Sequence, residues 1–205
     1  MPRLYFKYGT MGSSKSAEAL MTKFNYEQKG FKVLLLKPSI DNRDDVLEKT
    51  FVASRIGLKS EAFAFSPEQN LVKLFLDFKK QENYKVIIVD EAQFCKANQI
   101  EQLKELSNLV PVLCFGLKTN FKSFLFEGSK RLLEIADSIQ EIKNICSCGN
   151  KAIINARFIK DEITFDGTEV LIGGDEQYRA ICYNCWQKLI KKQKINLIKS
   201  KTTKD

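Results

Sequence analysis

The sequence predicts an α/β fold built on a mostly parallel sheet, followed by a small C-terminal subdomain. Patterns typical of buried strands alternate with helical patterns from residue 4 to about residue 136, as in a parallel sheet covered by helices. A loop of small residues separates the first strand from the first helix. Two cysteine pairs appear near the C-terminus, where the alternation stops. We therefore expect two structural units of different construction.

The first forty residues predict a βαβ unit. Residues 4–8 are typical of a strand, and residues 16–24 carry apolar side chains at helical spacing. Gly30 ends this helix, and residues 31–36 form a nearly continuous apolar run. Such a run indicates a strand that is buried on both faces of a parallel sheet.

The alternation of strands and helices continues beyond this unit. A helix is expected from Pro67, with Ser66 as its N-cap. Two buried strands follow, over residues 86–90 and 112–115. Two further helices are expected over residues 98–108 and 131–136. We assign residues 1–144 to this α/β domain.

Composition and charge exclude several classes of function. The chain contains no His, which excludes the Ser-His-Asp and Cys-His mechanisms of nucleophilic catalysis. No apolar run approaches the ~20 residues that span a bilayer, and the N-terminus lacks the apolar core of a signal peptide. We therefore expect a cytoplasmic protein without a membrane partner.

Basic charge is concentrated in the C-terminal tail, residues 187–205. The formal net charge is +8, and residues 186–205 hold seven Lys and one acid, a net of +6, which leaves about +2 (8 − 6) for the rest. We expect an amphipathic helical start after Cys185 and a flexible end from Lys199. A solvated end is the favoured interpretation, a contact with nucleic acid or a membrane is the alternative, and no specific nucleic-acid partner is expected.

The loop after the first strand predicts phosphate binding. Its residues are Gly9, Thr10, Met11, Gly12, Ser13, Ser14, Lys15 and Ser16. Small residues let backbone amides turn toward phosphates, Lys15 can reach the β- and γ-phosphates, and the Ser16 hydroxyl can bind Mg²⁺. Ser14 stands where the usual pattern has Gly, which costs roughly 1 kcal/mol if the loop needs a positive φ there. The alternative is a turn of small residues that caps a helix.

Two adjacent acids follow the buried strand over residues 86–90. Asp90 is the candidate for holding Mg²⁺ through water, and Glu91 is the candidate base for an attacking hydroxyl. A strand that ends in a polar turn is the alternative. The phosphate loop and the acids occur in the order of a P-loop nucleotide-binding domain, which favours the functional interpretation.

Four cysteines predict a structural zinc site. They form a C-x-C pair and a C-x-x-C pair, at Cys146, Cys148, Cys182 and Cys185. Four thiolates complete a tetrahedral zinc site with no open position for catalysis. Cys95 and Cys114 fall in or beside core strands and are expected to be buried. Four unrelated free cysteines are the alternative to zinc.

The zinc site would hold a long loop that has little core of its own. We call the 33 residues between the cysteine pairs, 149–181, the lasso, and residues 145–186 the zinc-binding lasso subdomain. A metal that binds both ends of such a loop closes it and stabilises its shape. Within the lasso we expect a hairpin over residues 152–174, with its turn at Asp166 and Gly167.

An ordered set of motifs resembles the zinc-containing, type II thymidine kinase family from about residue 4 to residue 186. The motifs are Gly9-Thr10-Met11, Lys15-Ser16, residues 37–43, Ser54-Arg55-Ile56-Gly57, Asp90-Glu91-Ala92-Gln93-Phe94, Phe115-Gly116-Leu117, residues 126–129, Ala136-Asp137, the cysteine pairs and residues 173–178. The resemblance implies an ATP-dependent kinase that phosphorylates the 5′-hydroxyl of thymidine, and of deoxyuridine as well. It makes residues 1–144 the kinase domain and Glu91 the catalytic base.

The resemblance also implies nucleotide, nucleoside and subunit contacts. Asp90 and Gln93 would act on the ATP side of the site with the phosphate loop and Mg²⁺. The lasso would cover the base through backbone groups near Leu171, Ile172, Gly173 and Gly174, with Tyr178 closing the pocket and with Met11, Leu117, Phe121 and Phe126 lining it. Ordinary core positions are the alternative for these last four. A homotetramer and feedback inhibition by dTTP are implied as well.

This chain departs from the family pattern at three places. Ser14 replaces a loop Gly, the first cysteine pair is one residue short, and Lys118-Thr119-Asn120 stands where the family commonly has acids. A catalytically impaired nucleotide sensor of the same fold is therefore the alternative function. A zinc protein that binds nucleic acid fits less well, because the basic charge lies outside the cysteine-containing segment.

Overall fold

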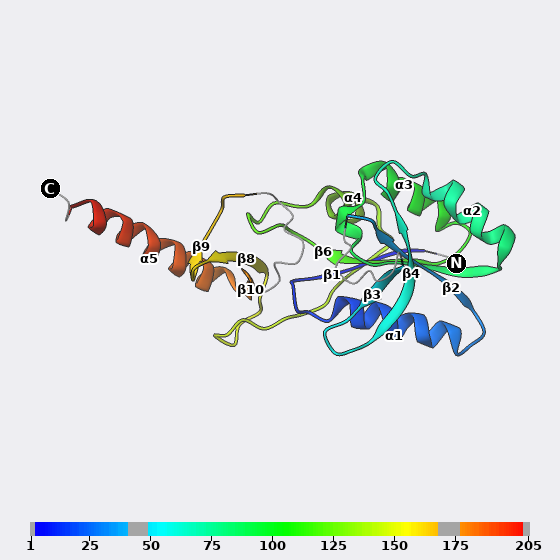
Figure 1. Ribbon diagram of the computed structural model, residues 1–205, viewed down its shortest axis with the longest axis horizontal. Coiled ribbons are helices and arrows are strands. Elements are labelled where there is room, and N and C mark those ends of the chain that lie inside the picture. Colours follow the sequence, from blue (N-terminus) through cyan, green and yellow to red (C-terminus); the bar gives the residue numbers. More distant parts are fainter. Residues whose placement is uncertain (1–2, 41–48, 168–176, 203–205) are drawn as a thin grey trace.

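The computed structural model describes residues 3–40, 49–167 and 177–202. Its centre is a seven-stranded sheet in the order β3-β4-β2-β5-β6-β1-β7 (Figure 1). The strands are β1 (Leu4–Gly9), β2 (Lys32–Pro38), β3 (Thr50–Ala53), β4 (Lys59–Phe65), β5 (Tyr84–Val89), β6 (Val112–Leu117) and β7 (Ser138–Glu141). Every pairing is parallel except β3 with β4. The predicted α/β fold with a mostly parallel sheet is confirmed.

Helices cover both faces of this sheet. Helix α1 (Lys15–Glu27) lies on one face, and α2 (Leu71–Gln81), α3 (Ala97–Leu106) and α4 (Glu127–Ile135) lie on the other (Figure 1). Side chains of β2 and β5 alternate between the two cores, because successive residues of a strand point to opposite faces. Leu34 and Ile87 face α2 to α4, whereas Leu35 and Ile88 face α1. Burial on both faces explains the continuous apolar runs.

The start of α2 differs from the prediction. The helix begins at Leu71, and its N-cap is Asn70, whose side chain accepts a hydrogen bond from the Lys73 amide at 2.9 Å. Ser66 instead begins a turn in which the Gln69 amide donates to its carbonyl at 3.1 Å. The prediction of a helix from Pro67 was wrong because a turn with its own hydrogen bond precedes the helix.

The C-terminal residues form a second, smaller sheet with its own core. Its strands are β8 (Ile154–Ile159), β9 (Glu162–Ile163) and β10 (Tyr178–Ile181), in the antiparallel order β10-β8-β9. Their apolar side chains pack with Cys146 and Cys182 in a cluster separate from the two cores of the large sheet.

The hairpin of this small sheet turns earlier than the sequence predicts. Lys160 and Asp161 connect β8 to β9, both with positive φ (48° and 63°), as in a type I′ turn that matches the twist of a hairpin. Asp166 and Gly167 lie after β9 and outside the turn. The predicted turn at Asp166 was therefore wrong.

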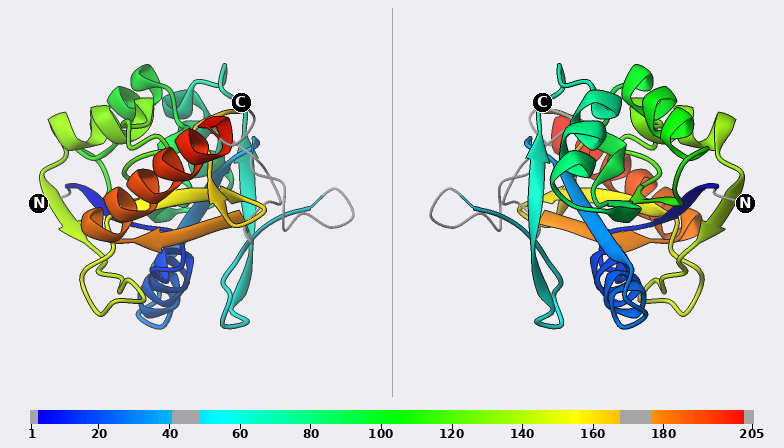
Figure 2. Two further views of the ribbon diagram at one scale, coloured as in Figure 1. Left: turned by 90° about the vertical axis from the view of Figure 1, so that its left-hand side faces the viewer. Right: turned by 90° about the vertical axis from the view of Figure 1, so that its right-hand side faces the viewer.

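Helix α5 (Tyr183–Thr202) follows the small sheet. Trp186, Leu189 and Ile190 pack against the core of the lasso subdomain, and the helix then extends away from the rest of the molecule (Figure 1). In the left view of Figure 2 this side faces the viewer, and α5 lies in front. The helical part passes the point at Lys199 where we expected it to end, and the flexibility of the tail stays a prediction. Within the described residues, no helix is both long and apolar enough to cross a membrane.

Candidate functional site

The carboxyl ends of β1, β5 and β6 bring the predicted site residues to one edge of the sheet. Gly9, at the end of β1, pairs in register with Leu117 at the end of β6, and β5 pairs with β6 up to Val89. The phosphate loop follows β1, and Asp90 and Glu91 follow β5, so they leave the two strands that flank β6 at the same edge. Crevices at such edges are the usual ligand sites of open α/β sheets.

The phosphate loop turns tightly between β1 and α1. A Cβ on Gly9 would collide with the Ser13 hydroxyl and lie 2.6 Å from the Ile142 carbonyl oxygen, so the start of the loop requires glycine. The Lys15 side chain is buried, and its Nζ donates to the Thr10 carbonyl at 2.9 Å. The lysine thus folds back over the loop, where a bound phosphate would be its alternative partner.

Ser14 adopts the left-handed conformation that the usual glycine would take without strain. Its φ is 64° and its ψ is 24°, and its side chain makes no capping hydrogen bond to α1. Serine is strained in this region by roughly 1–2 kcal/mol, because its Cβ crowds the following carbonyl oxygen. The departure from the loop pattern therefore has a structural cost.

Asp90 has the surroundings expected of a residue that holds a cation. It is 3% exposed, and it accepts a hydrogen bond from Ser16, the other predicted Mg²⁺ residue. Burial, with the neighbouring Glu91 carboxylate, raises the pKa of Asp90 to about 7. Its Oδ1 atom is buried without a hydrogen-bond partner among the described residues. This orphaned oxygen, beside a hydroxyl and Lys15, fits a hydrated Mg²⁺ ion.

Gln93 orients Glu91 in the first turn after β5. Glu91 has a left-handed backbone (φ 52°) and precedes a short 3₁₀ helix, η1 (Ala92–Phe94). The Gln93 amide donates to Glu91 Oε2 at 2.5 Å, and its Oε1 accepts from the Leu117 amide at 2.9 Å. Gly116 permits this contact, because a Cβ there would lie 2.6 Å from Gln93 Oε1. The predicted contact of Gln93 with the nucleotide stays a prediction.

Helix α4 fixes the aromatic residues beside this turn. A Cβ on Gly128 would lie 2.5 Å from the Ala92 carbonyl oxygen, so α4 can approach η1 closely only with glycine there. Phe126, the N-cap residue of α4, is 9% exposed and meets Phe94 edge-on at 5.7 Å between ring centroids. The structure thus places Phe126 beside the turn that carries Glu91, and its role in lining a nucleoside pocket stays a prediction.

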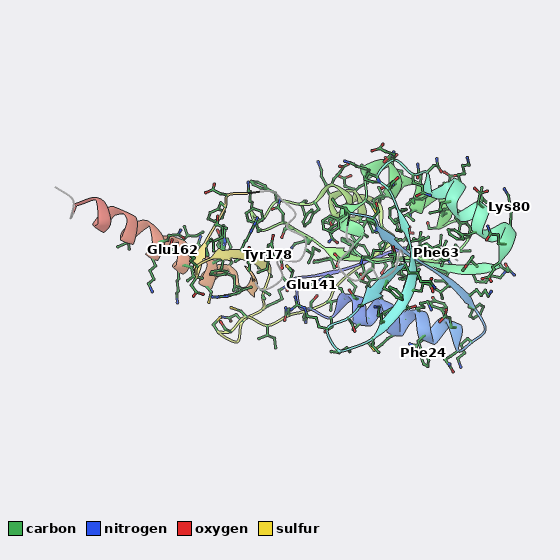
Figure 3. The ribbon with its side chains drawn as sticks, viewed as in Figure 1. Phe24, Phe63, Lys80, Glu141, Glu162 and Tyr178 are labelled. Carbon is green, nitrogen blue, oxygen red and sulfur yellow. The ribbon has the colours of Figure 1, made fainter. Side chains whose placement is uncertain are left out.

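Arg157 on β8 brings two predicted nucleoside residues together. Its guanidinium lies 5.2 Å from the ring centroid of Phe121 and 5.8 Å from that of Tyr178, within the range of cation–π attraction. Tyr178 lies between the large sheet and the far end of the lasso subdomain (Figure 3). Leu171, Ile172, Gly173 and Gly174, predicted to read the base, lie outside the described residues.

The four cysteines meet as predicted. The sulfur atoms of Cys146, Cys148, Cys182 and Cys185 all lie within 4.8 Å of one another. The Cys148 and Cys182 sulfurs are 3.6 Å apart, close to the ~3.8 Å edge of a tetrahedron with Zn–S bonds of ~2.3 Å. Hydrogen bonds from Asn150 lower the pKa of the Cys148 thiol to about 6, which favours the thiolate that binds metal. The C-x-C spacing is therefore compatible with a structural zinc ion, whereas Cys95 and Cys114 are buried in the main core.

Two asparagines that sequence reasoning missed contact the phosphate loop: Asn144 directly precedes the lasso subdomain, and Asn155 lies within it. Asn144 donates to the Thr10 hydroxyl at 3.0 Å and to the Met11 carbonyl at 2.9 Å, and Asn155 accepts from the Met11 amide at 2.8 Å. Their partners are more than 130 residues away in sequence. No local pattern could have revealed these contacts.

Comparison with known proteins agrees with this geometry. A family model described as "Thymidine kinase" matches residues 2–186. The chain belongs to the thymidine kinase family. The protein named thymidine kinase of Enterobacteria phage T4 is 42% identical to this chain, over 94% of this chain and 99% of its own length. That of Legionella pneumophila strain Paris is 41% identical, over 89% of this chain and 88% of its own length. That of Haemophilus influenzae strain Rd is 40% identical over 89% and 94%.

Membership of the thymidine kinase family confirms the resemblance found in the sequence. The match includes the phosphate loop, the acids after β5 and all four cysteines, since it extends from residue 2 to residue 186. Most of α5 lies beyond the matched residues. The matched residues therefore comprise the two sheets and the segments between them.

Proposed function

We propose that this chain transfers the γ-phosphoryl group of ATP to the 5′-hydroxyl of thymidine, and also of deoxyuridine. The observation that carries the proposal is the convergence of the Lys15 loop, buried Asp90 and oriented Glu91 at one sheet edge. Family membership supports thymidine as the nucleoside, because the relatives carry that name. Phosphoryl transfer requires little covalent chemistry from the protein, so positioning and electrostatics dominate catalysis.

Lys15 would act on the phosphates of ATP. In the structure its ammonium group has the Thr10 carbonyl oxygen as a partner, and a phosphate oxygen is a stronger partner because it carries a full charge. The side chain is buried, so its charge acts with little screening by water. Gly12, Ser13 and their neighbours would supply backbone amides around the phosphates.

Asp90 and Ser16 would hold Mg²⁺ beside these phosphates. Bound there, the ion supplies charge neutralisation for the developing negative charge on the phosphoryl group. Asp90 is suited to this position because its buried carboxylate oxygen lacks a protein partner among the described residues. A cation beside Asp90 would also favour the charged carboxylate and oppose the rise in its pKa.

Glu91 would accept the proton of the 5′-hydroxyl. The hydrogen bond from Gln93 to Glu91 Oε2 restricts the Glu91 side chain to one direction, as a base that must meet a substrate hydroxyl requires. Because Gln93 is itself fixed by Leu117 on β6, the base is held by two neighbouring strands. This arrangement lowers the entropy that the reacting groups lose when they align.

The lasso subdomain would bind the nucleoside base. Phe121 and Tyr178 approach the same guanidinium, Met11 follows β1, and Leu117 is the last residue of β6. A structural zinc ion on the four cysteines would stabilise this subdomain, and the predicted base contacts at residues 171–174 belong to the same loop. Lys118 lies over the Tyr8 ring at 5.4 Å, and its ammonium group cannot take the place of the family's acid in positioning Mg²⁺.

We further propose a cytoplasmic homotetramer that dTTP inhibits by occupying the substrate sites. Apolar side chains at the outer face of α1 support self-association, because Met21 and Phe24 are 49% and 59% exposed and Phe24 points away from the molecule (Figure 3). Contiguous exposed apolar side chains are typical of subunit contacts. Light scattering coupled to size-exclusion chromatography measures the subunit number directly.

Purified protein with labelled thymidine, ATP and Mg²⁺ tests the proposed function. We expect a thymidine 5′-monophosphate product that depends on all three components, and a second product with deoxyuridine. Omission of Mg²⁺ is the control for the cation site. Nucleotide binding without turnover of either nucleoside would contradict the proposal and support a nucleotide sensor.

A further inference from the structure

The lasso subdomain and the residue directly before it, Asn144, contact the phosphate loop. Asn144 donates through Nδ2 to Thr10 Oγ1 and to the Met11 carbonyl oxygen, at 3.0 and 2.9 Å. Asn155 accepts from the Met11 amide at 2.8 Å and donates to the Thr119 carbonyl at 3.1 Å. Side chains from outside the large sheet therefore hold the peptide group before the Met11 Cα and the one after it.

We propose that Asn144 and Asn155 are positioning residues through which the cysteine cluster controls the affinity of the phosphate loop for ATP. The inference rests on the proposed function for the identity of the ligand. It adds a second role for the metal site, because zinc would then act on the ATP side as well as on the nucleoside side.

The connection from the cysteine cluster to Asn144 is short and hydrogen-bonded. Asn144 Oδ1 accepts from the Ile145 amide at 2.8 Å, so the side chain is locked to the backbone that leads directly into Cys146. The next hydrogen bonds, from the Cys146 amide to the Asn150 carbonyl and from the Ala152 amide to the Asn144 carbonyl, close a small turn. A shift of Cys146 therefore shifts the amide group that holds Met11.

The connection to Asn155 runs through the small sheet. Asn155 lies on β8 and is 3% exposed, and it pairs in register with Ala180 on β10, two residues before Cys182. Its two hydrogen bonds join the phosphate loop to the segment that follows β6. Buried side-chain amides with both groups satisfied have few alternative positions. Asn155 therefore holds Met11 wherever the two cysteine pairs place β8.

The phosphate loop needs such external support. Gly9, at the start of the loop, lacks a side chain that would restrict its backbone. Gly12 and Ser14 both have positive φ, of 74° and 64°. Loop amides bind phosphate best when they already point at it, because ordering the loop during binding would cost affinity. The two asparagines supply this order from outside the loop, so their loss is expected to weaken ATP binding before it affects the nucleoside.

The substitution Asn144→Asp tests the contact between Asn144 and Met11, because the side chain keeps nearly the same shape. The new carboxylate can still accept from Ile145, but it repels the Met11 carbonyl and the phosphates. We expect the Kd for MgATP, measured by calorimetry without thymidine, to rise at least tenfold, with zinc content unchanged and the thymidine KM within threefold. Asn108→Asp is the matched control, because Asn108 is exposed after α3, at the opposite end of β6. Its Kd for MgATP should stay within twofold.

Asn144→Ala serves if the aspartate variant loses zinc or fails to fold. It removes the donors without adding charge, so a rise of roughly three- to tenfold in the Kd for MgATP is expected from two lost hydrogen bonds. A Kd within twofold of the parent in a folded, zinc-loaded Asn144 variant would overturn the proposal. A general loss of stability would lower the melting temperature without this selective effect on ATP.

A double-mutant cycle tests the link to the cysteines. Cys148→Ser weakens one ligand of the cluster, and we expect it to raise the Kd for MgATP at least threefold in the parent but less than twofold in Asn144→Ala. Equal effects in both backgrounds, or no effect on ATP in the parent despite lost zinc, would overturn the proposal. Thymidine turnover by the parent is measured separately. Its absence contradicts the proposed function, while the ATP-binding cycle still decides the role of the asparagines.

Discussion

Replacing Ser14 by glycine should stabilise the protein. Ser14 has a φ of 64°, is exposed, and makes no capping hydrogen bond, so the substitution removes strain and little else. Relief of the left-handed penalty is worth about 1–2 kcal/mol, and the added freedom of glycine in the unfolded chain costs about 0.4–1 kcal/mol. The net gain is about 0.5–1 kcal/mol, or about 1–4 °C in melting temperature for a chain of this size.

Differential scanning calorimetry of the nucleotide-free protein measures this shift. Gly30→Ala is the matched control of opposite sign, because Gly30 has a φ of 77° and an added Cβ would meet no atom within 4 Å. It should lower the melting temperature by about the same amount. The ATP KM of Ser14→Gly should change by no more than roughly tenfold, which is ~1.4 kcal/mol. A lower melting temperature for Ser14→Gly would refute the strain argument, and a thousandfold gain in activity would mean that the natural loop is impaired.

Three further predictions concern the metal, the phosphates and the nucleoside. Elemental analysis should find about one zinc per chain, and less than about a third of an equivalent in protein never exposed to chelator would contradict the zinc-held lasso. Lys15→Ala should lower kcat by ~10² or more in steady-state assays, because it removes a charge from a largely desolvated site, and an unchanged kcat would contradict this role. Tyr178→Ala should mainly raise the thymidine KM and leave the ATP KM within about threefold; the reverse pattern would remove the lasso from the nucleoside site.

Local signals in the sequence predicted the parts of the site that depend on neighbouring residues. The continuous apolar runs predicted the strands of the sheet, and the lysine-containing loop between β1 and α1 is where we predict that phosphates bind. Asp90 could be singled out as a candidate cation ligand because it ends a buried strand, and acidic residues are rarely buried in a core. The four cysteines could be predicted to form one site because they occur as two closely spaced pairs, and the structure brings all four sulfurs together.

Other features depend on competition between nearby residues, which periodicity does not resolve. Both Ser66 and Asn70 are good helix caps, and only the turn between them makes Asn70 the cap of α2. The hairpin turns at Lys160 and Asp161, which lack the glycine that usually marks a type I′ turn. The sequence instead offered Asp166 and Gly167, a stronger local signal in the wrong place.

Long-range hydrogen bonds left no trace in the sequence pattern. Asn144 and Asn155 meet Thr10 and Met11 only because the lasso subdomain folds back onto the edge of the large sheet. The orientation of Glu91 by Gln93 depends in the same way on a backbone amide of β6. Such contacts are properties of the tertiary structure, so sequence reasoning could name the reacting groups but not what holds them.

Comparison of Glu91→Gln with the parent tests whether Glu91 is the base that accepts the 5′-hydroxyl proton. The amide keeps the size of the side chain but cannot accept the 5′-hydroxyl proton, and general-base catalysis typically contributes about 10²–10⁴ in rate. The measurement is single-turnover transfer of the labelled γ-phosphoryl group from ATP to thymidine, with the Kd for MgATP measured on the same samples. We expect transfer to slow by at least ~10² while the Kd for MgATP stays within about threefold. Transfer by Glu91→Gln at the parent rate would contradict the account of this site.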